Sequence, residues 1–150
     1  MAGHLRRSST TSAPTESDSP FVYLDASAFV KLVLDEPESA TLEAYLSARS
    51  KPTVSNALLR IEAIRAVWIG TGSSTAVAEI RDALDDVNLV SLDDATIRRA
   101  ETIEPSALRT LDAIHLVTAL HVGAREMIVY DRRLADAARA QGLTVTSPGA

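Results

Sequence analysis

Short, continuously apolar stretches alternate along this chain with longer stretches in which apolar residues recur every three to four positions. The short stretches are typical of buried strands, and the longer ones are typical of helices with an apolar face. The strands that this pattern predicts cover residues 21–25, 52–56, 88–92, 126–130 and 143–147. The helices that it predicts cover residues 26–36, 39–49, 57–70, 73–86, 93–104, 111–123 and 131–142.

Alternation of strands and helices is typical of a parallel sheet covered by helices on both faces. We therefore predict an α/β fold, a three-layer α/β/α domain with a short-stranded parallel sheet. This domain covers residues 21–148, where the sequence has no internal repeat and no further boundary. Residues 1–20 are rich in Ser, Thr and Pro and have almost no large apolar side chains, so we predict a disordered N-terminal extension.

Composition narrows the kinds of site that the domain can carry. The chain has no cysteine, which excludes both disulfides and thiolate metal ligands. No apolar run reaches the roughly 18 residues that a membrane-spanning helix needs, and nothing resembles a signal peptide. We therefore expect a cytoplasmic protein without a membrane partner.

The formal net charge of −5 argues against a simple nucleic-acid binder. Affinity for a phosphate backbone normally comes from a basic surface of Lys and Arg. A protein of this charge that acts on RNA needs positive charge from a bound divalent metal and from a few local arginines.

Four acidic residues stand out from the rest, and they are called the four acids below: Asp25, Glu62, Asp112 and Asp131. Asp25 and Asp131 each follow a predicted strand, and ligands of parallel sheets bind beyond the carboxyl ends of the strands. Glu62 and Asp112 lie in apolar helices. A carboxylate is rarely buried without a partner, because removing its charge from water is costly.

Each of the four acids also has a purely structural interpretation. Asp25, Asp112 and Asp131 stand at predicted helix starts, where Asp is a favoured N-cap worth about 1 kcal/mol. Glu62 can pair on the helix surface with Arg60 or Arg65. Ser27 and His115, near Asp25 and Asp112 respectively, are candidates for supporting roles, although a cap and core packing explain them as well.

Taken together, the four acids favour a metal site. Carboxylate oxygens are hard ligands suited to Mg²⁺ or Mn²⁺, and a zinc site is disfavoured in a chain with three histidines and no cysteine. Such ions can activate water and stabilise charge on a phosphodiester. The combination therefore predicts a nuclease with an acidic cluster.

Four segments of the chain, in this order, resemble the PIN-domain family, and closely its VapC toxin branch. They are YLDASAFVKL, IEAIRA, LRTLDAIHLVTAL and VYDRRLADAARAQGLTV, and each contains one of the four acids. The similarity extends from Phe21 to Pro148. One departure is Val129, which stands where many relatives carry Thr or Ser two residues before the fourth acid.

The resemblance implies an Mg²⁺- or Mn²⁺-dependent endoribonuclease of a type II toxin–antitoxin system. The four acids would hold the ion or ions, with Asp25 and Asp112 as the principal ligands and Glu62 binding directly or through water. It also implies an RNA substrate, a cognate VapB-like antitoxin and a homodimer. Arg109, Arg132 and Arg133 are candidate contacts to the RNA backbone.

Three alternative functions remain open, and in two of them Asp25 is a covalent nucleophile. A phosphatase of the haloacid-dehalogenase type would use Asp25 as nucleophile but needs a second Asp two residues on, where this chain has Ser27. A response-regulator receiver needs a lysine late in the chain, and the lysines here are Lys31 and Lys51. A non-catalytic PIN-like binding module would keep the fold and use the acids as caps.

Overall fold

The computed structural model describes residues 20–150, which form seven helices and one five-stranded sheet. The predicted N-terminal extension lies outside these residues except for position 20. The strands are β1 (Val22–Leu24), β2 (Thr53–Asn56), β3 (Asn88–Val90), β4 (Glu126–Ile128) and β5 (Thr144–Thr146). The helices are α1 (Ala26–Val33), α2 (Ser39–Arg49), α3 (Leu59–Thr71), α4 (Ser74–Leu84), α5 (Asp94–Ala100), α6 (Thr110–His121) and α7 (Arg132–Ala140).

The sheet is parallel throughout and has the strand order β3-β2-β1-β4-β5. The chain starts in the middle, builds outward through β2 and β3, and then returns to the other side of β1 for β4 and β5. The order therefore reverses between β1 and β4. In open parallel sheets this reversal opens a crevice at the carboxyl edge, where ligands bind.

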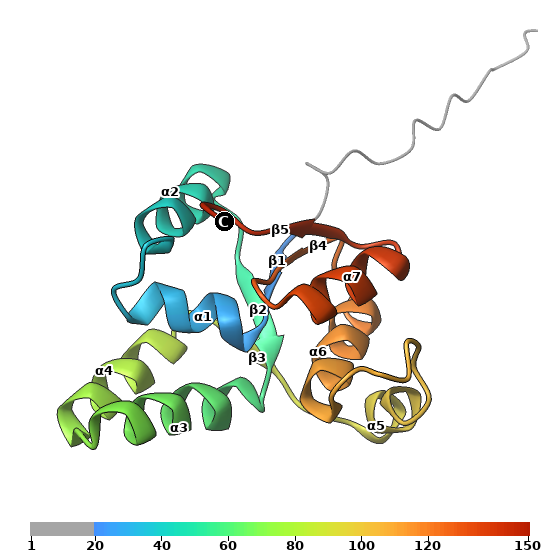
Figure 1. Ribbon diagram of the computed structural model, residues 1–150, viewed down its shortest axis with the longest axis horizontal. Coiled ribbons are helices and arrows are strands. Elements are labelled where there is room, and N and C mark those ends of the chain that lie inside the picture. Colours follow the sequence, from blue (N-terminus) through green and yellow to red (C-terminus); the bar gives the residue numbers. More distant parts are fainter. Residues whose placement is uncertain (1–19) are drawn as a thin grey trace, which may run out of the picture.

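Alternate side chains of β1 point to opposite faces of the sheet, as the pleat requires. Tyr23 belongs to a core formed with α6 and α7, whereas Val22 and Leu24 pack with α1 and α2. Figure 1 shows the sheet between these two helical layers. The predicted three-layer α/β/α architecture is confirmed.

Helices α3 and α4 pack against each other and share an apolar cluster with Phe29 of α1. Gly72 ends α3 with φ of 61°, a left-handed conformation that glycine adopts without steric cost, and its N–H donates to Trp68 O. None of the helices in the described part of the chain is long and apolar enough to span a membrane.

The predicted helix over 93–104 is too long, because α5 ends at Ala100. The chain then turns so that Ile103 and Leu108 pack against the core beside α6 and α7. Pro105 also disfavours helical backbone at the residue before it. The other predicted elements are present, with ends that differ from the prediction by three residues at most, and the helix over 39–49 has both bounds as predicted.

Candidate active site

Asp25 directly follows β1 and is the N-cap of α1. Its Oδ1 accepts hydrogen bonds from the Ala28 backbone N–H at 3.1 Å and from Ser27 Oγ at 2.7 Å. Only 4% of its surface is exposed. Asp25 therefore caps its helix, as the structural interpretation expects, but it is also a buried carboxylate without a cationic hydrogen-bond partner among residues 20–150.

Ser27 joins the ends of β1 and β4. Its Oγ accepts from the backbone N–H of Tyr130 at 2.9 Å while it donates to Asp25. The next residue, Asp131, is the N-cap of α7 and accepts from the Leu134 N–H at 3.0 Å. The hydroxyl of Ser27 is thus already engaged, and its role here is to hold the Asp25 carboxylate beside the strand end that leads to Asp131.

Asp112 stands in the first turn of α6, two residues after the helix begins. The N-cap of α6 is Arg109, which makes no side-chain capping hydrogen bond. The capping interpretation of Asp112 is therefore wrong, and this half-buried carboxylate needs another explanation.

Glu62, in the first turn of α3, reaches α6 rather than a neighbouring arginine. Its Oε2 lies 2.6 Å from His115 Nε2, and His115 is almost fully buried. No ion pair between Glu62 and Arg60 or Arg65 is present in residues 20–150. The surface-pair interpretation of Glu62 is therefore wrong.

Two further residues complete this contact, and sequence reasoning missed both. His115 Nδ1 lies 2.9 Å from Tyr23 Oη and 3.2 Å from Asn56 Nδ2. A signal for Asn56 existed, because it ends β2 and so stands at the same sheet edge as Asp25. The sequence signal for Tyr23 was weaker: it is the one residue with a polar group in a strand that is otherwise aliphatic.

The acids at this edge influence one another electrostatically. Burial raises the pKa of Asp25 to about 6. Burial also raises the pKa of Asp112, and the negative charges of Asp131 and Glu62 raise it further. The negative charges of Asp131 and Glu62 thus disfavour the negative charge of Asp112. A divalent cation bound near these carboxylates would offset this repulsion.

The donor chemistry of the four acids fits Mg²⁺ or Mn²⁺, since the groups are carboxylate oxygens. Within residues 20–150, however, no group of three or more His, Asp or Glu side chains is arranged to hold a metal ion. Asp112, Asp131 and Glu62 are charged neighbours, and Asp25 is held at the same edge of the sheet by Ser27. Val129, where many relatives have a hydroxyl, is buried in the core and offers no ligand.

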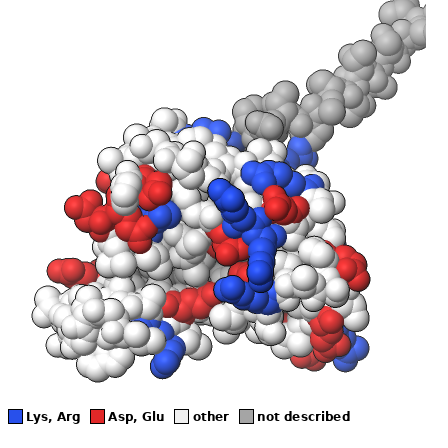
Figure 2. Space-filling model, in the orientation of Figure 1, with Lys and Arg blue, Asp and Glu red and all other residues white. Residues whose placement is uncertain are grey.

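Basic side chains lie beside acidic ones on one face of the molecule. Figure 2 shows acidic side chains gathered near the middle of this face, with a band of Lys and Arg beside them on the side of α7. Arg109, Arg132 and Arg133 are all exposed. Arg109 is close enough to act electrostatically on Asp112, where its positive charge lowers the pKa.

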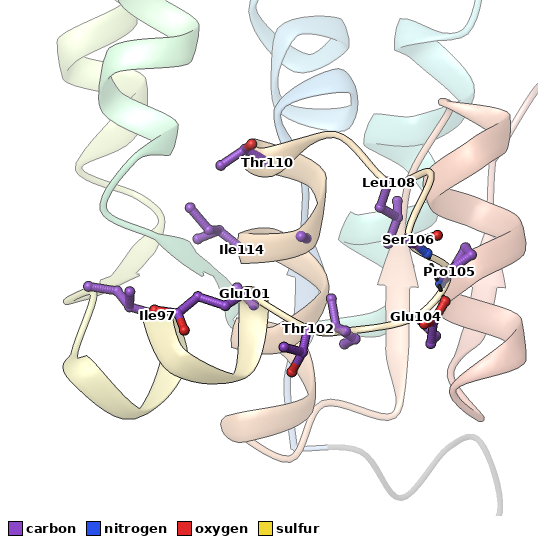
Figure 3. A pocket seen from close by; sticks show the side chains of 12 residues that line it. Ile97, Glu101, Thr102, Glu104, Pro105, Ser106, Leu108, Thr110 and Ile114 are labelled. Carbon is purple, nitrogen blue, oxygen red and sulfur yellow. Dashed lines mark hydrogen bonds between the residues drawn. The ribbon is translucent and has the colours of Figure 1, made fainter.

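The described residues also form a hollow of about 490 Å³ beside α5, α6 and the segment that joins them. Figure 3 shows Ile97, Glu101 and Ile114 among its lining residues. None of the four acids lines it. We therefore place the candidate site at the carboxyl edge of the sheet, where the titratable groups lie.

Comparison with known proteins agrees with this picture. Residues 22–140 match the PIN domain family. The chain is 43% identical over 129 residues to Ribonuclease VapC46 of Mycobacterium tuberculosis, covering 85% of this chain and 97% of that protein. It is 37% identical over 135 residues to Ribonuclease VapC47 from the same species, covering 86% and 98%.

Solved structures share the fold at low sequence identity. Mycobacterium tuberculosis VapC20, a sarcin-ricin loop cleaving toxin, superposes with a TM-score of 0.67 and 16% identity, covering 85% of this chain and 99% of that one. VapBC2 from Rickettsia felis, bound to a promoter DNA fragment, superposes with a TM-score of 0.68 and 10% sequence identity. The match covers 84% of this chain and 97% of that one. The chain belongs to the PIN-domain family, among the VapC proteins.

Proposed function

We propose that this protein is a metal-dependent endoribonuclease and the toxin of a toxin–antitoxin pair. The observation that carries the proposal is the crowding of carboxylates at the reversal point of the sheet, in a chain that is 43% identical to Ribonuclease VapC46. Caps alone do not account for Asp112 or Glu62, which make no capping hydrogen bond in the described structure.

Mg²⁺ or Mn²⁺ is the cofactor that we propose. Asp25 and Asp112 would be its principal ligands, with Asp131 and Glu62 completing the set. When bound, such an ion supplies activation of water and stabilisation of the charge that develops on a phosphodiester.

The chain's own residues have distinct tasks in this proposal. Ser27 and the Ala28 N–H fix the Asp25 carboxylate, leaving Oδ2 outside both hydrogen bonds. Glu62 orients the attacking water. Arg109, with Arg132 and Arg133 at the start of α7, would bind RNA phosphates and offset the net charge of −5.

The partners that we propose are an RNA substrate, a cognate VapB-like antitoxin and a second copy of this chain. The antitoxin is supported by the likeness to VapBC2. The homodimer is supported by exposed apolar side chains on α3, of which Ile61, Trp68 and Ile69 are 58%, 53% and 71% exposed. The location that we propose is the cytoplasm, in line with an RNA substrate. Light scattering of the purified chain tests the dimer.

The decisive experiment compares the wild-type protein with its Asp25→Asn variant on total cellular RNA. Both are incubated with Mn²⁺ or Mg²⁺ and, separately, with EDTA. We expect discrete cleavage by the wild type that needs metal and is lost in the variant. The ends of the fragments identify the substrate.

The non-catalytic binding module remains the alternative. If it is right, an antitoxin-like partner binds the wild type and Asp25→Asn equally well. Neither protein then cleaves any RNA. That result would overturn the proposed nuclease.

A further inference from the structure

His115 connects three elements of the fold from one buried ring. It lies on α6, one turn after Asp112, and only 1% of its surface is exposed. One ring nitrogen faces Glu62 of α3, and the other faces Tyr23 of β1 and Asn56 of β2. The ring also packs edge-to-face against Tyr23, with the ring centroids 5.9 Å apart.

The surroundings of Nδ1 determine which nitrogen carries the hydrogen. The backbone N–H of Leu58 donates to Asn56 Oδ1 at 2.9 Å, which fixes the orientation of the Asn56 amide. The amide nitrogen of Asn56 must therefore face His115 Nδ1, and an amide NH₂ is only a donor. Nδ1 is consequently an acceptor, shared between Asn56 and the Tyr23 hydroxyl.

A neutral imidazole that accepts at Nδ1 carries its hydrogen on Nε2. This hydrogen points at Glu62 Oε2, 2.6 Å away. No other hydrogen bond to the Glu62 carboxylate is found in the described residues. The flexible Glu62 side chain is therefore aimed by one donor, and that donor is fixed by two buried neighbours.

We propose that His115 is a positioning residue, which holds the Glu62 carboxylate near Asp112 through a hydrogen bond from Nε2. Asn56 and Tyr23 keep the ring in the form that donates. The role of the held carboxylate in metal binding and water orientation rests on the proposed function. The orientation of the Glu62 carboxylate by His115 is argued only from the contacts among Glu62, His115, Asn56 and Tyr23.

A double-mutant cycle tests the proposal in the full chain. Four proteins are compared: wild type, His115→Leu, Glu62→Gln and the double variant. Mn²⁺ affinity is measured by calorimetry without RNA, and RNA cleavage is measured separately. Changing groups that orient a metal ligand lowers metal affinity or activity by about 10- to 100-fold, so we expect a loss in that range for His115→Leu.

The same substitution should have almost no further effect once Glu62 is Gln, because two residues that act through one contact are not additive. His115→Gln, whose amide can donate from nearly the position of Nε2, should restore much of the loss. His121→Leu alters the more exposed histidine of α6, 49% exposed in its side chain, and should change neither readout. The proposal would be overturned if His115→Leu lowered Mn²⁺ affinity equally in the wild-type and Glu62→Gln backgrounds. It would also be overturned if His115→Leu bound Mn²⁺ as tightly as the wild type does.

Nuclear magnetic resonance of the wild type keeps the proposal testable should His115→Leu fail to fold. In protein with ¹⁵N-labelled histidine, we expect the neutral His115 ring to carry its hydrogen on Nε2 rather than on Nδ1. A neutral ring with its hydrogen on Nδ1 would overturn the proposal. If the wild type binds Mn²⁺ but cleaves no RNA, the proposed function fails while the cycle on Mn²⁺ affinity still decides the role of His115.

Discussion

Among single residues, Asp25 belongs to the candidate site and lowers the free energy of unfolding at neutral pH. Its carboxylate is buried, and burial raises its pKa from 3.8 to about 6. Between these pH values the folded state binds more protons at this group than the unfolded state does. The free energy of unfolding therefore falls as pH rises through this window, and the full penalty remains at neutral pH.

Asp25→Asn removes this penalty and keeps an oxygen that accepts from Ser27 and the Ala28 N–H. Since each pKa unit corresponds to about 1.4 kcal/mol, we expect the metal-free variant to be more stable than wild type by about 1–3 kcal/mol at pH 7.5. Urea unfolding in EDTA measures the difference. The gap should shrink as pH falls toward 4, and a variant less stable than wild type at pH 7.5 would contradict this.

Sequence reasoning predicted these residues unevenly. Asp25 and Asp131 follow from their place after strands, because the carboxyl ends of parallel strands share one edge. His115 was a weak candidate, since its partners Tyr23 and Asn56 lie 92 and 59 positions away along the chain. Contacts over such separations depend on how the helices pack, which local periodicity does not determine.

At the scale of elements, Ser27 determines how α1 and the end of β4 meet. Its Oγ receives the Tyr130 N–H and donates to Asp25. Ser27→Ala leaves the Tyr130 N–H without this acceptor, and loss of a partner for a buried polar group costs about 1–3 kcal/mol. We expect a loss of that order in the free energy of unfolding, with Ser106→Ala on the exposed segment after α5 as the control.

Ser27→Thr should preserve most of the stability, because it retains the hydroxyl. Chemical unfolding of the three variants at one pH gives the comparison. If Ser27→Ala were as stable as Ser106→Ala, the hydrogen bonds of Ser27 between the two strand ends would contribute nothing to the free energy of unfolding.

Helix α2 is tied to the sheet by a second buried carboxylate. Glu126 of β4 is 3% exposed and accepts hydrogen bonds from Tyr45 of α2 and from Thr146 of β5. Arg49 Nε lies 3.5 Å from its other oxygen. Tyr45→Phe should destabilise the fold by about 1–3 kcal/mol, because it removes a donor from a buried charge.

A second substitution separates this hydrogen bond from the packing of the Tyr45 ring. In the background of Glu126→Gln, whose side chain is uncharged, Tyr45→Phe should have a smaller effect on thermal unfolding. An equal effect in both backgrounds would mean that the hydroxyl contributes through other contacts.

The boundaries of elements were the least accurate part of the sequence prediction. Apolar positions continue through Ile103, and a helix was predicted to residue 104, yet α5 ends at Ala100 and Ile103 packs against the core from the segment that follows. A side chain that packs from a loop and one that packs from a helix leave the same apolar position in the sequence.

At the scale of the whole molecule, the alternation of strands and helices predicted the layers but not the strand order. Continuously apolar strands require cover on both faces, which follows from the sequence. The placement of β4 beside β1, rather than beyond β3, does not follow from any local pattern. It is this placement that sets the end of β4, which leads to Asp131, directly beside the end of β1, which leads to Asp25.

The charge of the whole molecule determines how it can bind RNA. A net charge of −5 gives no general attraction for phosphate, so the proposed function assigns the electrostatic affinity to Arg109, Arg132 and Arg133. Each phosphate neutralised on single-stranded nucleic acid contributes about −0.7 to the slope of log affinity against log salt concentration. Three contacts therefore predict a slope of about −2, shallow for a nucleic-acid-binding protein.

The slope is measured in EDTA with the Asp25→Asn background, which separates arginine contacts from metal and prevents cleavage. Alanine at all three arginines should bring the slope close to zero and weaken binding most at low salt. Arg98→Ala, at an exposed position near the end of α5, should leave the slope unchanged. If the triple variant kept the slope of its parent, the phosphate contacts would lie elsewhere on the surface.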